Sequence, residues 1–190
     1  MLKVGIMAFQ GAVDEHIVAV ERAMKNLGIT GKGVPVQQTL NGIDALIIPG
    51  GESTAIYNLM LKAGIVEEIQ NRADDMPIMG TCAGCILLAS KVSDNNMPTL
   101  DLMNFTVERN AFGRQNESFQ CMLDIKGFNT PVPGIFIRAP LIHKIWGNCE
   151  ELAKINQGIV MARQKNKLAL VFHPELTNNV KIHQYFLEML

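Results

Sequence analysis

PIMGTCAGCILLAS, residues Pro77–Ser90, contains the pattern that decides the fold. An apolar run leads into Gly80, a cysteine stands between two glycines, and a second apolar run follows. This pattern is typical of a buried strand that turns sharply into a helix, because glycines let the backbone tighten at the corner. Such a corner exposes the residue at its tip, which here is Cys82.

The same strand, turn and helix occur twice earlier in the chain. Leu2–Phe9 has the composition of a buried strand, and Ala12–Leu27 repeats apolar side chains at helical spacing. Ile43–Thr54 joins an apolar strand to a Pro-Gly-Gly turn, after which Ser53 or Thr54 is expected to cap a helix. Three such units predict a three-layer α/β fold, in which helices flank a mostly parallel central sheet.

The second half of the chain has little helix between its strand-like runs, which cover residues 104–109, 118–125, 134–139 and 158–174. Short connections of this kind favour antiparallel additions or hairpins on the same sheet. Residues 180–190 are periodic and predict a closing helix. Within the first half, the segment 28–42 gives the weakest strand signal.

Length and composition predict one domain that spans residues 1–190. The chain is 48% hydrophobic, which is enough for a sizeable core, and no Pro/Gly/Ser-rich linker divides it. The formal net charge is -1, with 17 basic and 18 acidic residues spread along the sequence, so we expect no nucleic-acid partner. We also expect no membrane association and a cytoplasmic location, because no apolar run could span a bilayer and no signal-peptide pattern is present.

Cys82 and Cys85 form a Cys-x-x-Cys pair that admits three interpretations. A redox pair is disfavoured, because Thr81 and Ala83 replace the aromatic-rich flank of thioredoxin-like motifs. A zinc site needs about four ligands, and the other cysteines and the histidines show no paired spacing, so we expect no metal and no other cofactor. The favoured interpretation is a nucleophile at Cys82, where N–H groups of the helix start stabilise a thiolate, with Cys85 as a buried core residue.

A cysteine nucleophile needs a base, and the base needs an orienting group. His173 and Glu175 stand two residues apart at the end of an apolar strand, so in extended geometry both side chains leave the same face. Glu175 is expected to accept a hydrogen bond from one imidazole nitrogen while the other nitrogen faces Cys82. The alternative is a solvated pair at a strand end. His16 and His183 are expected to be surface or packing histidines.

Six motifs follow one another along the chain: QGAVDEH (10–16), PGGEST (49–54), GTCAG (80–84), VERNAFGRQ (107–115), FIRAP (136–140) and FHPELT (172–177). Together they resemble the class I glutamine amidotransferases, and more narrowly the PdxT family, the glutaminase subunits of pyridoxal 5'-phosphate synthase. TCAG and HPE alone indicate only a glutaminase. GAVDEH, VERNAFGRQ and FIRAP, in this order and spacing, separate the PdxT family from the glutaminases of histidine, purine or pyrimidine synthesis.

The resemblance implies a class I amidotransferase-like fold and a triad of Cys82 as nucleophile, His173 as base and Glu175 as orienting group. It implies hydrolysis of L-glutamine to L-glutamate and ammonia through a glutamyl thioester. The ammonia would pass to a partner, the synthase subunit that makes pyridoxal 5'-phosphate, in a hetero-oligomer.

The resemblance also implies contacts to glutamine, by Gly51, Glu52, Ser53, Arg109, Ile137 and Arg138. A guanidinium suits the α-carboxylate of glutamine and a glutamate suits its α-ammonium, although a structural ion pair is the alternative for each arginine. We expect the oxyanion hole at the backbone N–H of Ala83 and in the turn formed by Gly50 and Gly51. Contact with the synthase is expected at Gln10 and Gly11.

Two other functions stay open. A cysteine hydrolase or peptidase on the same fold would use the same triad, and a thiol regulator would oxidise Cys82 and Cys85 reversibly without turnover. The arginines and the GGEST sequence favour an amino-acid substrate over both. Cys85 stands where similar proteins usually carry an aliphatic residue, and the sequence suggests no role for His143 or Trp146.

Overall fold

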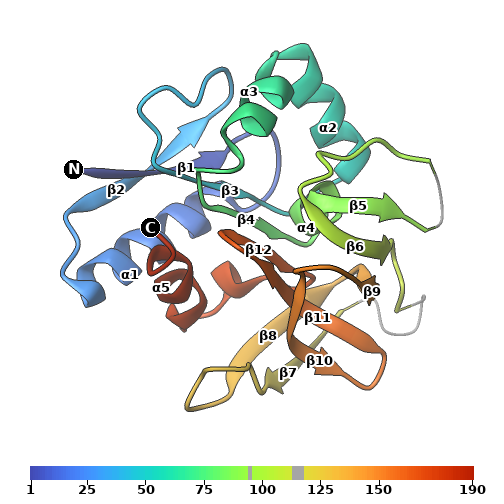
Figure 1. Ribbon diagram of the computed structural model, residues 1–190. Helices are drawn as coiled ribbons and strands as arrows, with labels where there is room; N and C mark the ends of the chain where they lie inside the picture. The colour runs from blue at the N-terminus through green and yellow to red at the C-terminus, as the bar shows by residue number, and fades with distance from the viewer. Residues whose placement is uncertain (94–95, 113–117) are drawn as a thin grey trace.

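Strands and helices alternate in the first half of the chain, and the second half is mostly strand. The computed structural model describes residues 1–93, 96–112 and 118–190 (Figure 1). The first half contains β1 (Leu2–Met7), α1 (Val13–Leu27), β2 (Gly31–Val36), β3 (Ala45–Ile48), α2 (Ser53–Lys62), α3 (Ile65–Arg72), β4 (Ile78–Thr81) and α4 (Ala83–Leu88). The second half contains β5 (Ala89–Val92), β6 (Met103–Glu108), β7 (Ser118–Leu123), β8 (Val132–Ile137), β9 (Leu141–Ile145), β10 (Glu150–Ile155), β11 (Gly158–Gln164), β12 (Lys167–Leu170), the 3-10 helix η2 (Pro174–Leu176) and α5 (Lys181–Leu187).

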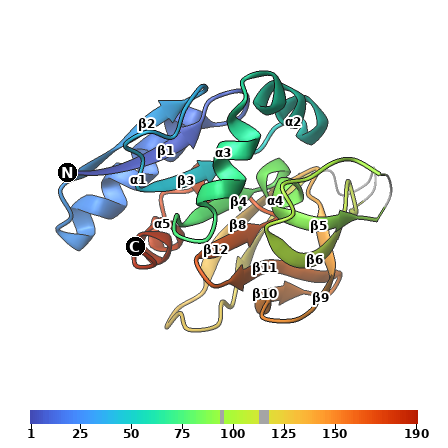
Figure 2. The same cartoon turned by 45° about the horizontal axis from the view of Figure 1, so that its top comes forward.

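Ten strands of the described residues form one sheet in the order β2-β1-β3-β4-β12-β11-β9-β6-β5, with β10 paired to β11. Strands β2, β1, β3, β4 and β12 are parallel, whereas β11 is antiparallel to its three neighbours. The connections β1 to β2 and β3 to β4 run in opposite directions along the sheet, so right-handed crossovers place α1 on one face and α2 with α3 on the other. Figures 1 and 2 show these layers, with α5 beside α1. The predicted three-layer α/β fold is confirmed.

Strands β7 and β8 form a separate antiparallel pair, so the prediction that these runs join the central sheet was wrong. The apolar face of the pair packs across the main body instead of beside an edge strand. Phe119 stacks on Phe136 with ring centroids 4.4 Å apart, and Phe136 in turn lies 5.6 Å from Phe172. The carbonyl of Ile135 accepts a hydrogen bond of 2.8 Å from the N–H of His173. The hairpin therefore holds the segment that carries His173.

The weak segment 28–42 contains β2, which forms one edge of the sheet. Pro35 lies inside this strand, and an edge tolerates proline because no neighbour needs its missing N–H. Val36 is the one residue of β2 that is fully buried. A strand with so little buried surface leaves a weak apolar pattern, which explains the poor signal.

Several elements differ from the predicted pattern. Helix α4 has only six residues and continues directly as β5, because a buried apolar run can serve as either helix or strand. Strands β9 and β10 were not predicted. The closing helix covers Lys181–Leu187 and is shorter than the predicted 180–190. No helix among the described residues has both the length and the apolar character required to cross a bilayer.

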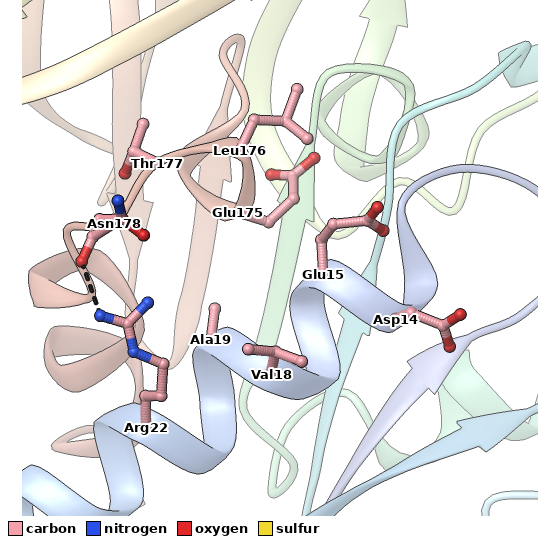
Figure 3. Close-up of a pocket in the computed structure, with 9 residues that line it drawn as sticks. All are labelled: Asp14, Glu15, Val18, Ala19, Arg22, Glu175, Leu176, Thr177 and Asn178. Carbon is pink, nitrogen blue, oxygen red and sulfur yellow. Dashed lines mark hydrogen bonds between the residues drawn. The ribbon is translucent and has the colours of Figure 1, made fainter.

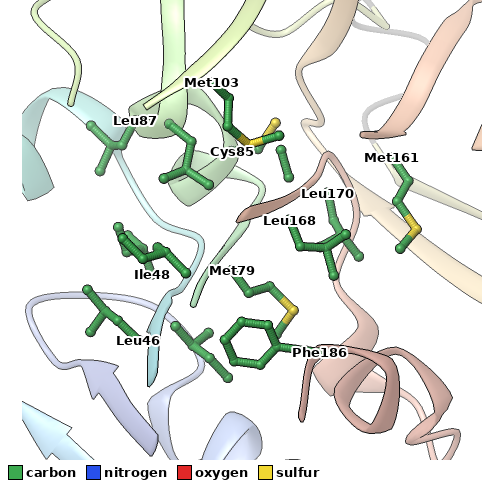
Figure 4. Close-up of a cluster of buried hydrophobic side chains, with 14 of the residues drawn as sticks. Leu46, Ile48, Met79, Cys85, Leu87, Met103, Met161, Leu168, Leu170 and Phe186 are labelled. Carbon is green, nitrogen blue, oxygen red and sulfur yellow. The ribbon is translucent and has the colours of Figure 1, made fainter. Parts of the chain in front are cut away.

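The core continues from the parallel half of the sheet into the antiparallel half. Figure 4 shows Leu46 and Ile48 of β3, Met79 of β4 and Leu170 of β12 in one cluster, which Phe186 of α5 covers. All five side chains are fully buried. Because β12 lies between β4 and β11, the last strand of the chain links the two halves.

Candidate active site

Four parallel strands end at the same edge of the sheet, and the segments after them carry the predicted site residues. These segments are Gln10–Gly11 after β1, Pro49–Gly51 after β3, Cys82 after β4 and His173 after β12. Carboxyl ends of parallel strands meet at one edge, which is where open α/β sheets bind ligands. The N–H of Cys82 donates a 2.8 Å hydrogen bond to the carbonyl of Leu170, so β12 delivers His173 beside Cys82.

Cys82 occupies a strained corner between β4 and α4. Its φ of 50° and ψ of -105° are unusual for a residue with a side chain. A Cβ atom on Gly80 would lie 2.4 Å from the carbonyl oxygen of Gly84, and a Cβ on Gly84 would lie 1.9 Å from that of Ile48. The corner therefore closes only because glycines stand two residues before and two residues after Cys82.

His173 lies between Glu175 and Cys82. Its Nδ1 is 2.7 Å from Glu175 Oε1, and the Glu175 side chain is 0% exposed, which excludes a solvated pair. The residues after His173 form η2, so a tight turn and not the predicted extended strand makes the contact. A Cβ on Gly50 would lie 2.6 Å from His173 Cε1, so the turn after β3 packs directly on the imidazole.

The surroundings of His173 favour its protonated form. Burial by itself lowers the pKa of His173, but hydrogen bonds to Cys82 and Glu175, together with their negative charges, raise it to about 10. An imidazolium at this place stabilises a thiolate at Cys82 and is in turn stabilised by the Glu175 carboxylate.

Cys85 differs from Cys82 in every respect that governs thiol reactivity. It is fully buried in the core cluster of Figure 4, as predicted. Burial raises the pKa of the Cys85 thiol well above its usual 9.0, and charge on Cys82 or Cys149 raises it further. All four cysteines are free thiols. Cys85 therefore stays neutral and acts as a small core residue.

A pocket of about 460 Å³ opens beside Cys82. Its lining includes Cys82, Ala83 and His173, together with all six residues expected to contact glutamine: Gly51, Glu52, Ser53, Arg109, Ile137 and Arg138. The sequence did not single out Ile86 and Asn110, which complete the lining. The fold thus brings the predicted nucleophile, the imidazole and the charged side chains to one cavity.

Glu52 makes two interactions at this pocket. Its Oε2 accepts a 2.7 Å hydrogen bond from the N–H of Ala55, so Glu52 caps α2 and the predicted caps, Ser53 or Thr54, were wrong. The longer glutamate side chain reaches forward to a free N–H of the first turn. Arg109 Nη2 donates to Glu52 Oε1 at 3.1 Å. An ion pair, the alternative left open for Arg109, is therefore present at the pocket.

The end of β8 forms another wall of the pocket. The carbonyl oxygen of Ile137 lies 3.9 Å from Cys82 Sγ, within reach of a weak hydrogen bond from the thiol. Arg138 follows with a φ of 44°, a left-handed backbone that turns the chain at the end of the strand. Ser53, which also lines the pocket, is buried, with its hydroxyl 3.4 Å from Met97 Sδ.

Gln10 and Gly11 brace the glycine turn after β3. Gln10 Oε1 accepts a 2.9 Å hydrogen bond from the N–H of Glu52. A Cβ on Gly11 would lie 2.3 Å from the carbonyl oxygen of Gly50, so this oxygen faces Gly11. Because the peptide bond is trans, the Gly51 N–H points away from Gly11.

A row of buried polar groups behind Glu175 was missed by the sequence analysis. His16 and His183 are fully buried, so they are packing and not surface histidines. His16 Nδ1 lies 3.2 Å from His183 Nε2, and His16 Nε2 lies 3.3 Å from Thr81 Oγ1 and 3.4 Å from Glu175 Oε2. The helical period places His16 on the same face as Val20, which is the signal that would have found it.

Helix α1 packs directly against the segment that carries Glu175. Figure 3 shows Ala19 and Arg22 of α1 facing this segment across a second pocket of about 450 Å³. Arg22 Nη2 donates a 3.2 Å hydrogen bond to the carbonyl oxygen of Asn178. This contact fixes the position of α1, and therefore of His16, relative to Glu175.

His143 lies on β9 and Trp146 directly follows this strand, and both interact with β6 or the residues beside it. His143 pairs with Glu108 of the neighbouring strand β6, and both side chains are exposed. The N–H of Trp146 donates a 3.1 Å hydrogen bond to the carbonyl of Asn104. Residues 113–115 of the VERNAFGRQ motif lie outside the described residues.

Comparison with known proteins gives a family match and close relatives over the whole chain. The SNO glutamine amidotransferase family matches residues 6–190. The pyridoxal 5'-phosphate synthase subunit PdxT of Niallia circulans is 46% identical over 192 residues, which cover 100% of this chain and 98% of that protein. PdxT of Archaeoglobus fulgidus is 46% identical over 195 residues, with 99% and 98% covered. A crystal structure of a glutamine amidotransferase superposes with a TM-score of 0.88 at 41% identity and covers 98% of this chain and 97% of its own.

Proposed function

Because the chain belongs to the SNO glutamine amidotransferase family, we propose that Cys82, His173 and Glu175 form the triad with which it hydrolyses glutamine. The chain is a glutaminase that releases ammonia for pyridoxal 5'-phosphate synthesis, the pathway of vitamin B6. One observation carries the triad: His173 has Glu175 Oε1 2.7 Å from its Nδ1, lines the same pocket as Cys82, and has its pKa raised to about 10 by these two residues.

In the first step, the Cys82 thiolate attacks the side-chain amide carbon of glutamine, and the carbonyl oxygen takes the negative charge. The backbone N–H groups of Ala83 and Gly51 stabilise this oxyanion. Ala83 begins α4, where an N–H has no partner inside the helix. The orientation of the Gly51 N–H away from Gly11 supports its assignment as the second donor.

In the next step, His173 donates its proton to the leaving nitrogen, the carbon–nitrogen bond breaks, and ammonia departs. His173 then takes a proton from water, whose oxygen attacks the glutamyl thioester. The carbon–sulfur bond breaks, which regenerates the Cys82 thiolate and releases glutamate. Throughout the cycle Glu175 orients the imidazole and stabilises its positive charge.

The charged lining of the pocket orients the substrate. Arg109 or Arg138 binds the α-carboxylate of glutamine, and Glu52 binds the α-ammonium group. The carboxylate of Glu52 is already fixed by Ala55 and Arg109, so it presents a preorganised negative charge. Ser53 and Ile137 complete the contacts along the substrate side chain.

A synthase subunit receives the ammonia. Free ammonia is mostly protonated in neutral water and is then a poor nucleophile, so release into solvent would waste it. The relatives are themselves named as subunits of pyridoxal 5'-phosphate synthase. We place the docking contact at Gln10 and Gly11, because they brace the glycine turn that holds the oxyanion donor.

In this proposal residues 1–190 act as one amidotransferase domain in a cytoplasmic hetero-oligomer. The core that runs through both halves of the sheet supports one domain. A formal net charge of -1 offers no attraction to nucleic acid or to an anionic membrane surface.

Substitution of the nucleophile tests the triad. Cys82→Ala, assayed together with the synthase subunit, is expected to release no glutamate from glutamine, while Cys85→Ala keeps most of the parent activity. Glutamate release by Cys82→Ala at the parent rate would contradict the proposal. Cleavage of peptides in place of glutamine would favour the peptidase alternative.

A further inference from the structure

The Glu175 carboxylate lies between two imidazole rings. Its Oε1 is 2.7 Å from His173 Nδ1, and its Oε2 is 3.4 Å from His16 Nε2. Oε2 is buried and has no hydrogen bond of regular geometry from any described residue. A buried carboxylate oxygen is costly to leave without a donor, so the question is whether the nearby nitrogen of His16 carries a proton that it can donate.

The surroundings of His16 determine which of its nitrogens carries a proton. Burial lowers the pKa of His16 well below 6.5, and the nearby rings of His183 and His173 lower it further, so the ring is neutral and has one N–H. A lone pair on Nε2 would face the Glu175 carboxylate, which is repulsive. The proton therefore belongs on Nε2, and Nδ1 accepts a hydrogen bond.

His183 supplies the donor that this tautomer requires. Its Nε2 lies 3.2 Å from His16 Nδ1, and its own Nδ1 is buried without a hydrogen bond from the described residues. Burial lowers the pKa of His183 to about 4, so this ring is also neutral and its one proton is available for Nε2. The N–H bonds of His183 and His16 then both point toward Glu175.

We propose that His16 is a positioning residue that donates from Nε2 to the second oxygen of Glu175, and that His183 fixes the tautomer in which His16 can donate. This inference rests on the proposed role of Glu175 in the triad. Donors on both oxygens keep the carboxylate from rotating away from His173. The Thr81 hydroxyl, 3.3 Å from the same nitrogen, holds the ring beside the residue that precedes Cys82.

Paired variants of His16, assayed with the synthase subunit, test the donor. His16→Leu removes the N–H, whereas the amide nitrogen of His16→Gln reaches about as far as Nε2. We expect His16→Leu to lower kcat about ten- to hundredfold, as for a lost hydrogen bond to a charged group, with KM nearly unchanged. The acid limb of its pH–rate profile should move to higher pH, because loss of a donor favours the protonated carboxyl group.

The control variant, His16→Gln, should keep most of kcat and the parent pH profile. Equal losses of kcat in the two variants, or no loss in either, would overturn the inference. A purely structural role of His16 would not depend on whether the new side chain has an N–H donor. If His16→Leu does not fold, His183→Leu is compared with His183→Gln instead. His183→Leu removes the donor that fixes the tautomer of His16, whereas His183→Gln keeps an N–H donor.

A spectroscopic measurement tests the tautomer without turnover. In the free chain labelled with 15N-histidine, long-range proton–nitrogen spectra at neutral pH should show His16 as the neutral Nε2–H form. His183→Leu should add the Nδ1–H form. An Nδ1–H ring in the parent protein would overturn the inference. Should the spectra agree while Cys82→Ala still releases glutamate, the triad fails and the histidine arrangement stands.

Discussion

Two buried histidines of this protein have opposite protonation preferences, although both are removed from solvent. His173 interacts with Cys82 and with the Glu175 carboxylate, and its pKa rises to about 10. His183 faces another neutral ring, and burial lowers its pKa to about 4. Burial disfavours the charge in both cases, and only the presence of anions reverses the outcome. The same residue type therefore favours its protonated form in one place and its neutral form in the other.

Because the pKa of His173 is raised, the free energy of unfolding should decrease as the pH rises from about 6.5 to about 10. The folded protein holds this proton up to about pH 10, whereas an unfolded histidine loses it near 6.5. The stabilisation is therefore complete below pH 6.5 and is lost as pH rises toward 10, by up to about 1.4 kcal/mol per pH unit. Urea unfolding of the parent and of His173→Gln at several pH values measures it. The assignment would be contradicted if the difference in unfolding free energy between the parent and His173→Gln stayed constant from neutral to alkaline pH.

The four thiols should differ strongly in their rate of alkylation. Burial raises the pKa of Cys85 well above 9.0, that of Cys149 to about 11 and that of Cys121 to a lesser degree. We expect iodoacetamide at neutral pH to modify Cys82 first, with one equivalent bound, because Cys82 lines an open pocket beside His173. Mass spectrometry of the parent and of Cys82→Ala measures this selectivity. A fast-reacting thiol that persists in Cys82→Ala would be evidence against it.

At the scale of elements, a helix start and a turn depend on the absence of a side chain for different reasons. A Cβ on Gly84 would meet the backbone oxygen of Ile48 at 1.9 Å, whereas a Cβ on Gly50 would meet the His173 ring at 2.6 Å. We expect Gly84→Ala to lower the free energy of unfolding by about 3 kcal/mol or more, because α4 and β3 must separate. Gly50→Ala should instead displace the imidazole and lower kcat about a hundredfold.

Urea unfolding and glutaminase assays of both variants separate these effects. Gly50→Ala should unfold at a urea concentration closer to that of the parent than Gly84→Ala does, because its obstacle is a side chain and not backbone. Parent-like activity in Gly50→Ala would show that the turn does not control the position of His173.

Elements of the parallel half were predictable because their physical signals are local. Buried parallel strands are continuous apolar runs, and the corners after them need glycines, so β1, β3 and β4 were visible in the sequence. Strand β2 lies at an edge and buries only Val36. Within the part of the chain that the structure describes, strand β10 pairs only with β11, and its burial is partial. Such strands draw their stability from neighbours that the local sequence does not reveal.

For the molecule as a whole, the sequence predicted which residues line the pocket but not what lies behind them. Cys82 and His173 follow strands whose carboxyl ends must meet, so topology brings them together. The contact of His16 with Glu175 depends on how α1 packs on η2, and the cap at Glu52 depends on a side-chain conformation. Both are tertiary properties, which residue spacing does not encode.

Docking of the synthase subunit is expected to control turnover. Glutaminase activity should be low for the free chain and severalfold higher with the synthase present. Gln10→Ala should reduce this stimulation, because Gln10 Oε1 holds the N–H of Glu52 beside the glycine turn. Glutamate release measured with and without the synthase gives the comparison, and Gln38→Ala, at an exposed position after β2, is a matched surface control. Equal activity in both conditions would exclude control by docking.

The place of β12 in the sheet has a consequence for biosynthesis on the ribosome. This strand is translated after the other described strands of the sheet, yet it lies between β4 and β11 and precedes His173. While the nascent chain is incomplete, β4 has an unpaired flank that is prone to associate with other strands. The proposed triad is therefore incomplete until β12 and the segment after it have been translated, and premature termination before β12 leaves a polypeptide that has Cys82 but lacks His173.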